Sequence, residues 1–70
     1  MLVENYRSDL IRSDTAVANK TIREGAEYVG LSRFTFSKAY HGEPISRSSL
    51  KKIAKSFKRP LSDLIPGETV

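Results

Sequence analysis

The fold of this chain is decided by residues 21–42, which read TIREGAEYVGLSRFTFSKAYHG. Thr21 and Glu24 have the spacing of a capping box, in which each side chain accepts a hydrogen bond from the other residue's backbone N–H. The stretch therefore predicts a helix over Ile22–Val29. Gly30 should end it, because glycine readily takes the left-handed conformation found after helix ends.

A second short helix should follow after a three-residue turn. Ser32 is a preferred N-cap residue type, and it directly precedes the segment Arg33–Tyr40. Phe36 and Ala39 lie at helical spacing within that segment and should face inward. The pair His41–Gly42 should stop the helix.

The segment after residue 42 predicts one longer helix and one final turn. Ser46 is the expected N-cap of a helix that ends near Lys58, before Arg59–Pro60. Its apolar residues recur at the spacing of one helical face: Leu50, Ile53, Ala54 and Phe57. We expect Leu61–Ile65 to add one turn over the core and residues 66–70 to form a frayed, flexible tail.

The N-terminal segment predicts a helix over about Val3–Ala18. Its apolar residues fall on or near one helical face: Val3, Tyr6, Leu10, Ile11, Val17 and Ala18. Ser13, Asp14 and Thr15 favour caps or turns, which weakens the prediction that this helix is continuous. The pattern as a whole predicts an all-α fold of four to five helices, with residues 1–20 and 21–65 in one domain.

Composition limits the classes of function. A chain of 70 residues holds one small core, and without cysteine neither a disulfide nor a thiolate metal site supplements it. The net charge is +4, and residues 31–70 carry eight basic and three acidic side chains. This half is the expected polyanion-binding face. No apolar run approaches a membrane span and no secretory signal opens the sequence, so we expect a cytoplasmic protein.

Two short helices joined by a turn with glycine describe a helix-turn-helix, whose second helix can enter the major groove of DNA. Residues 21–42 resemble the helix-turn-helix of phage Cro/CI-type repressors (the XRE-like family), and they also resemble the LacI-type motif. Residues 46–65, with IAKSF and then PLSDLI, resemble the fourth and fifth helices of the Cro/CI type. A LacI-type headpiece normally opens its protein, whereas 20 residues precede the motif here.

The resemblance implies a bundle of the lambda-repressor-like DNA-binding type and a set of DNA contacts. The implied base-contacting residues are Ser32, Arg33, Phe34, Ser37 and Lys38. The implied backbone-contacting residues are Thr21, Thr35, His41, Ser46 and Arg47. Arg33 is the expected main base reader, because its planar guanidinium can bond O6 and N7 of a guanine, worth about 1–3 kcal/mol of discrimination. Phe34 can touch only an apolar feature such as a thymine methyl group.

Each assignment has a simpler alternative. Arg33 can be an ordinary solvated residue, and Phe34 can pack on Tyr40 or against a partner subunit. The lysines of the long helix fit the polar face that any amphipathic helix needs, with weak attraction of DNA as the alternative. These lysines are Lys51, Lys52, Lys55 and Lys58.

Catalysis is not expected, although His41 and Ser37 are base and nucleophile types. The chain has one histidine, no glycine-rich nucleophile elbow and little room for a substrate cleft. Its scattered carboxylates predict no metal site, and we expect no cofactor, small-molecule substrate or membrane. Most aromatic residues lie at core spacing, which favours duplex DNA over stacked single strands.

The sequence therefore predicts a transcriptional regulator, a repressor that binds a double-stranded operator as a homodimer. The alternative from another class is a helix-turn-helix module that binds a protein partner, as an antirepressor or antitoxin.

Overall fold

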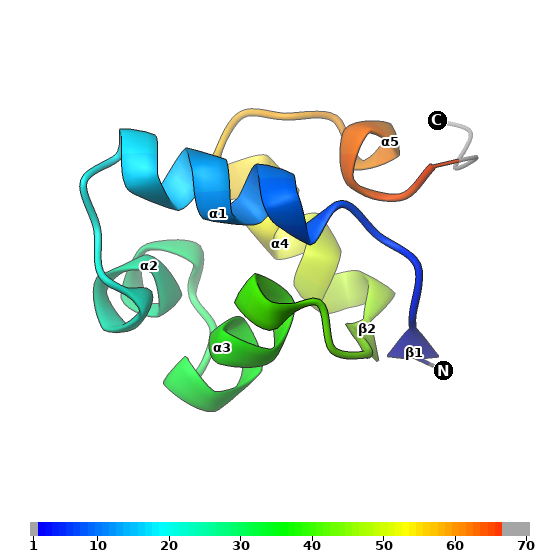
Figure 1. The fold of residues 1–70 in the computed structure, drawn as a ribbon, viewed down its shortest axis with the longest axis horizontal. Helices are drawn as coiled ribbons and strands as arrows, with labels where there is room; N and C mark the ends of the chain where they lie inside the picture. Colours follow the sequence, from blue (N-terminus) through cyan, green and yellow to red (C-terminus); the bar gives the residue numbers. More distant parts are fainter. Residues whose placement is uncertain (1, 67–70) are drawn as a thin grey trace.

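The computed structural model describes residues 2–66, which form five helices and two very short strands (Figure 1). The elements in chain order are β1 (Leu2–Val3), α1 (Ser8–Val17), α2 (Ile22–Val29), α3 (Arg33–His41), β2 (Ile45–Ser46), α4 (Arg47–Ser56) and α5 (Leu61–Leu64). The predicted small helical domain is thus confirmed. The two-stranded antiparallel sheet was not predicted.

The helices α2 and α3 follow the sequence signals closely. The Thr21 hydroxyl accepts from the backbone N–H of Glu24 at 3.1 Å, and the Glu24 carboxylate accepts from the backbone N–H of Thr21 at 2.9 Å. The second of these bonds lowers the pKa of the Glu24 carboxyl, because it favours the charged form. Gly30 and Gly42 take the left-handed conformation after α2 and α3, each at φ 80°. The helix α3 includes His41, one residue more than predicted.

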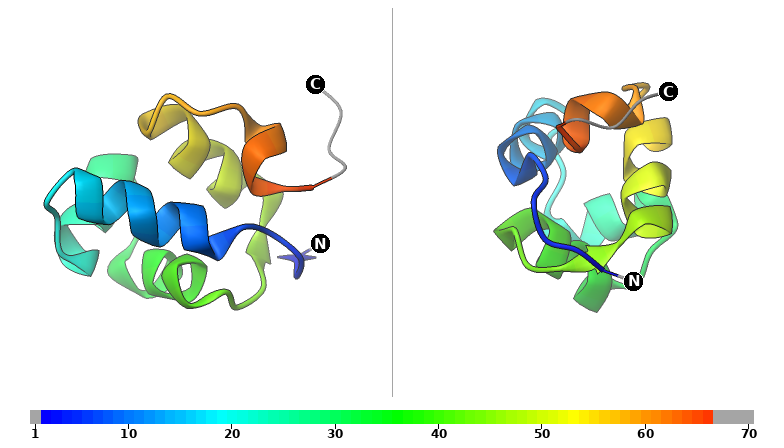
Figure 2. Two further views of the ribbon diagram at one scale, coloured as in Figure 1. Left: turned by 45° about the horizontal axis from the view of Figure 1, so that its top comes forward. Right: turned by 90° about the vertical axis from the view of Figure 1, so that its right-hand side faces the viewer.

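One hydrophobic core receives side chains from all five helices. Its fully buried members are Ile11 from α1, Phe36 from α3, Leu50 and Ile53 from α4, and Leu64 from α5. The helix α2 contributes Ala26 and Val29, and the strand β2 contributes Ile45. Figure 2 shows the helices packed around this centre, with α1 and α3 on one side and α4 on the other.

The prediction of a helix from Val3 onward was wrong. Val3 lies in β1, opposite Ile45 of β2, and the helix begins only at Ser8. The extended segment between them is stable because other elements satisfy its polar groups: the Arg7 backbone N–H donates to the carbonyl of Leu64 at 2.6 Å. The helix α1 then runs without a break through residues 13–15, where the buried Thr15 hydroxyl donates to the Ile11 carbonyl at 2.7 Å.

The apolar face expected for α1 was also wrong at its C-terminal end. Val17 is 85% exposed and Ala18 is exposed, so neither packs in the core. The buried side of this end is formed instead by Thr15, and by Asp14, which pairs with Arg59. Two polar residues that favour turns therefore lie on the inner side of a helix, each with a specific partner.

The helix α4 ends at Ser56, two residues before the predicted end near Lys58. Lys58 takes a left-handed conformation at φ 54°, and the next residue turns back so that the Arg59 backbone N–H donates to the Ala54 carbonyl. The Arg59 guanidinium then binds both carboxylate oxygens of Asp14, at 2.6 and 2.8 Å. This pair joins α1 to the connection between α4 and α5. Of the predicted tail, residues 67–70 lie outside the described residues.

Within residues 2–66, no helix has the length and apolar character that crossing a membrane requires.

Candidate nucleic-acid interface

The helix α3 is held against the protein along its inner side and at its C-terminal end. Phe36 and Ala39 are fully buried. The Tyr6 hydroxyl lies within hydrogen-bond distance of three carbonyl oxygens around the end of α3: those of Lys38 (3.2 Å), Ala39 (3.4 Å) and Glu43. Because the last carbonyls of a helix lack partners within the helix, such donors from outside fix its end in place.

A second donor reaches the same end of α3 from α1. The Arg12 guanidinium donates to the Tyr40 carbonyl at 2.7 Å and to the Ser8 hydroxyl at 3.2 Å. Burial and the nearby charge of Glu43 raise the pKa of Tyr6 to about 12, so the hydroxyl keeps its proton at neutral pH. The orientation of α3 is therefore set by α1 and by the extended segment before it, as well as by core packing.

The outward side of α3 follows from the position of its buried residues. Successive residues advance by about 100° around a helix, so the direction opposite Phe36 and Ala39 is taken by Phe34 and His41. Ser37 and Lys38 lie on either side of this direction. Arg33 lies further round, at the edge of the exposed face. The exposure of these residues agrees with this placement: Arg33, Phe34 and His41 are exposed, and Ser37 and Lys38 are half-buried.

Of the predicted base-contacting residues, Phe34, Ser37 and Lys38 share the outer face of α3, Arg33 lies at its edge, and Ser32 is the N-cap of the helix. The Ser32 hydroxyl is already engaged as the N-cap, accepting from the backbone N–H of Thr35 at 3.2 Å and donating to the Thr35 hydroxyl at 3.0 Å. Phe34 is 71% exposed, and the ammonium of Lys38 lies 4.8 Å from the centre of its ring. Tyr40 is the alternative partner for Phe34. Its ring lies edge-on to the His41 ring, with 5.4 Å between the ring centres.

The predicted backbone-contacting residues are more widely spread. Thr35 and Ser46 lie together beside Phe34 and Lys38, where α3 meets β2 and the start of α4. Ser46 is the N-cap of α4 and Arg47 its first residue, and His41 is exposed at the end of α3. Thr21, the N-cap of α2, lies apart from Thr35 and Ser46.

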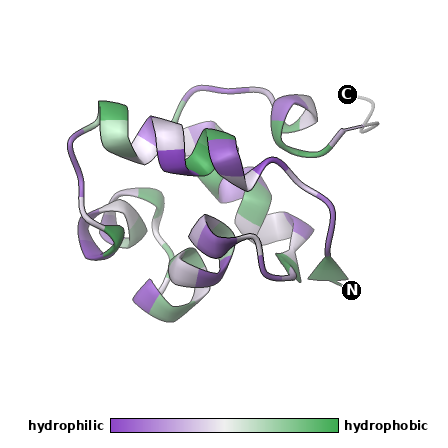
Figure 3. Ribbon diagram, in the orientation of Figure 1, coloured by the Kyte–Doolittle hydropathy of each residue, from purple (hydrophilic) through white to green (hydrophobic). Residues whose placement is uncertain are grey.

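The structure adds Leu2 and Pro44 to this surface, and sequence reasoning missed both. They line a groove of about 220 Å³ with Phe34, Thr35, Lys38, Ile45, Ser46 and Ser49. Leu2 reaches it because β1 pairs with β2, which places Leu2 opposite Ser46. Figure 3 shows β1 as a hydrophobic element at the edge of the molecule. Leu2 and Val3, two aliphatic residues near the chain start, gave no signal of pairing partners 44 and 42 residues away.

Charge is divided between the helices. Together, α3 and α4 contain six Lys or Arg residues and no Asp or Glu, whereas α1 and α2 contain two Arg residues and four acidic residues. Lys51, Lys52, Lys55 and Lys58 are all exposed, as a polar helix face requires. The groove beside α3 therefore lies between the two basic helices.

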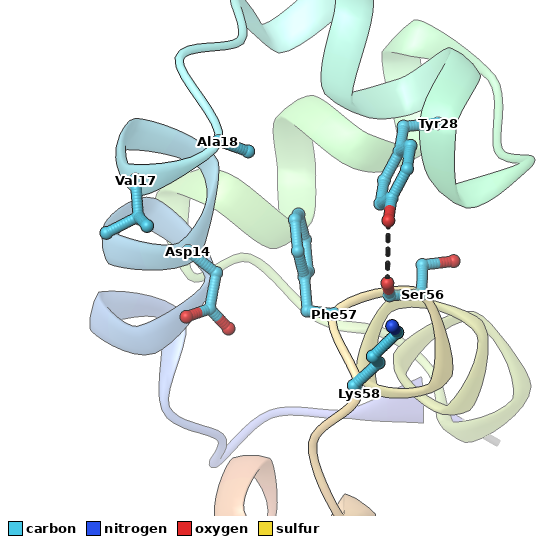
Figure 4. Close-up of a pocket in the computed structure, with 7 residues that line it drawn as sticks. All are labelled: Asp14, Val17, Ala18, Tyr28, Ser56, Phe57 and Lys58. Carbon is cyan, nitrogen blue, oxygen red and sulfur yellow. Dashed lines mark hydrogen bonds between the residues drawn. The ribbon is translucent and has the colours of Figure 1, made fainter.

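A larger hollow, of about 330 Å³, lies away from α3 at the C-terminal ends of α1 and α4 (Figure 4). The Tyr28 side chain crosses it from α2, and its hydroxyl donates to the Ser56 carbonyl at 3.1 Å. The rings of Tyr28 and Phe57 lie 5.7 Å apart, and Val17 and Ala18 line the opposite wall. Tyr28 is 51% exposed and carries the ammonium of Lys20 over its ring at 4.9 Å.

Comparison with protein-family models, with curated proteins and with solved structures finds no match for this chain. Within residues 2–66, no group of three or more His, Cys, Asp or Glu side chains is placed to hold a metal ion.

Proposed function

We propose that this chain is a sequence-specific regulator of transcription, a repressor of the Cro/CI type that reads double-stranded operator DNA in the major groove with α3. The observation that carries the proposal is the placement of α3. Its inner side is buried and its end is anchored, while its outer face presents Arg33, Phe34 and Lys38 with no carboxylate on the helix. A rigid helix exposed in this way suits the major groove, which is about 12 Å wide.

In this proposal the exposed residues divide into two roles. Arg33, Phe34, Ser37 and Lys38 face the base edges, and Arg33 supplies the main discrimination through guanine. Ser32 serves chiefly as the cap that fixes the start of α3. Thr35, His41, Ser46 and Arg47 contact phosphates that border the major groove, and Thr21 contacts a phosphate from the start of α2. The protein acts as a homodimer in the cytoplasm, at the nucleoid of a bacterial host, with two α3 helices about 34–36 Å apart on the operator.

The test is selection of duplexes from a random library, followed by titration of an enriched duplex and a scrambled duplex at several salt concentrations. The enriched duplex should bind at least a hundredfold more tightly, and its affinity should fall steeply with salt, because phosphate contacts release counterions. No enrichment and no duplex affinity at 50 mM salt would contradict the proposal.

A second candidate function is a protein-binding module, acting as an antirepressor or antitoxin. It is favoured by the hollow in Figure 4, where Tyr28 and Val17 are exposed around the Phe57 ring. Exposed apolar side chains gathered in one place are one mark of a surface that binds another protein. The salt series separates the two functions, because a module of this kind should show little affinity for any duplex.

A further inference from the structure

Two large, exposed apolar side chains line the same groove beside α3, on the proposed DNA-binding surface. Phe34 is 71% exposed and Leu2 is 59% exposed, and both line the groove between α3 and the β1–β2 pair. Leu2 comes from β1 and Phe34 comes from α3, 32 residues later in the sequence. Their meeting is a product of the fold, since only the pairing of β1 with β2 brings Leu2 to this place.

Both residues are positioned before any ligand arrives. The backbone of Leu2 is placed opposite Ser46 by the antiparallel pair. Phe34 is the second residue of a capped helix, and the Lys38 ammonium lies over its ring at 4.8 Å. A cation at this distance is attracted to the ring face and limits the ring's movement. The apolar pair is therefore a preorganised feature of the surface.

The charges around the pair indicate what covers it. Arg33 and Lys38 flank Phe34 on α3, Arg47 begins α4 beside Ser46, and neither helix contains an acidic residue. This surface complements a polyanion that also presents small apolar groups at the bottom of a groove. The major groove of DNA has one such group, the methyl on C5 of thymine, which 5-methylcytosine carries at the same position.

We propose that Phe34 and Leu2 form an apolar site for pyrimidine C5-methyl groups, so that the operator carries a methylated pyrimidine opposite this pair. The inference rests on the proposed function and deepens it, because it names a chemical group that the surface selects. Arg33 then reads guanine at the edge of the α3 face, while the apolar pair selects a neighbouring position by its methyl group. A preference for a base that carries this methyl group needs no hydrogen bond. The preference is lost when the methyl group alone is removed.

The experiment removes the methyl group and nothing else. Duplexes enriched from a random library are synthesised again with each thymine in turn replaced by deoxyuridine, which keeps every hydrogen-bonding group. Affinity should fall about three- to fivefold at one or two positions, as expected for one buried methyl group. In a second set, each cytosine is replaced by 5-methylcytosine. Tighter binding at a single position would assign the methyl source to methylated cytosine, whereas sensitivity to deoxyuridine alone would assign it to thymine.

Protein variants assign the effect to the pair. The variant Phe34→Ala should bind thymine and deoxyuridine duplexes equally, and Leu2→Ala should reduce the difference between them. Both residues are exposed, so the thermal midpoint should change little. Tyr28→Ala, which alters an exposed aromatic residue away from α3, should keep the full methyl effect.

The possible failures are distinguishable. Specific DNA binding without any response to deoxyuridine or 5-methylcytosine overturns this inference and leaves the proposed function standing. Phe34→Ala with unchanged affinity for every duplex also overturns it, because the Phe34 ring then contributes nothing to DNA binding. A chain that binds no duplex at all overturns the inference together with the proposed function.

Discussion

Gly25 shows how strongly a single position can depend on the fold. It lies inside α2, where glycine is less favourable than alanine by about 0.5–1 kcal/mol. A Cβ atom at this position would lie 2.7 Å from the ring of Phe36, which is fully buried. The close approach of α2 to α3 therefore requires glycine, for a reason that helix propensity does not contain.

Gly25→Ala should lower the free energy of unfolding, by about 1–3 kcal/mol, because the added Cβ atom overlaps the fully buried Phe36 ring and forces it to shift. Chemical denaturation measures this difference. Glu27→Ala, at an exposed position of the same helix, is the matched control and should change the free energy by less than about 0.5 kcal/mol. A more stable Gly25→Ala variant would show that α2 and α3 do not approach each other this closely.

For Arg33 we expect the opposite, an effect on DNA recognition and none on stability, because this residue is exposed at the edge of the α3 face. Arg33→Ala should leave the thermal midpoint unchanged and should relax base preference at one operator position by about 1–3 kcal/mol. Arg23→Ala, an exposed arginine on α2 beside Glu27, should leave the base preference intact. A collapsed thermal midpoint in Arg33→Ala would make this residue structural.

At the scale of elements, the placement of α3 depends on contacts that are distant in sequence. Tyr6 and Arg12 reach the carbonyl oxygens at the end of α3 from positions 28 to 37 residues away. These donors connect the start of the chain to the helix proposed to read DNA. The N-terminal segment is therefore part of the binding architecture, although none of the DNA contacts predicted from the sequence lies in it.

Tyr6→Phe should cost about 0.5–1.5 kcal/mol at neutral pH, because it leaves the carbonyl oxygens at the end of α3 without this donor. The pKa of Tyr6 is about 12 in the folded protein, above the value of about 10 in an unfolded chain. Its stabilising effect is therefore fully present below pH 10 and is lost as the pH rises through 12.

Unfolding by urea at pH 7, 10 and 12 measures this effect. The difference in the free energy of unfolding between the unmodified chain and Tyr6→Phe should narrow between pH 10 and pH 12. Tyr28→Phe, which removes a more exposed hydroxyl, is the control and should show a smaller difference at pH 7. A constant difference across the range would contradict the assigned role of Tyr6.

These elements also show what sequence could predict. The start and end of α2, and the start of α3, follow from caps and glycines within a few residues, and local signals of this kind are readable. The segment before Ser8 was misassigned because its apolar spacing fits a helix, while its actual stability comes from β2, α3 and α5. For the same reason sequence found Arg33, Phe34 and Lys38 for the candidate site but missed Leu2.

At the scale of the whole molecule, the distribution of charge is consistent with DNA binding on the side that carries α3 and α4. The basic helices α3 and α4 border the groove beside Phe34, and the more acidic helices α1 and α2 carry the hollow around Tyr28 together with the end of α4.

The central claim is that the outer face of α3 contacts duplex DNA, and NMR chemical-shift mapping tests it most directly. The ¹⁵N-labelled chain is titrated with an enriched duplex and then with a scrambled duplex. The account predicts the largest shifts at Arg33, Phe34, Lys38 and the start of α4, with smaller shifts at the same residues for the scrambled duplex. Shifts concentrated around Val17, Tyr28 and Phe57, or none with either duplex, would contradict it.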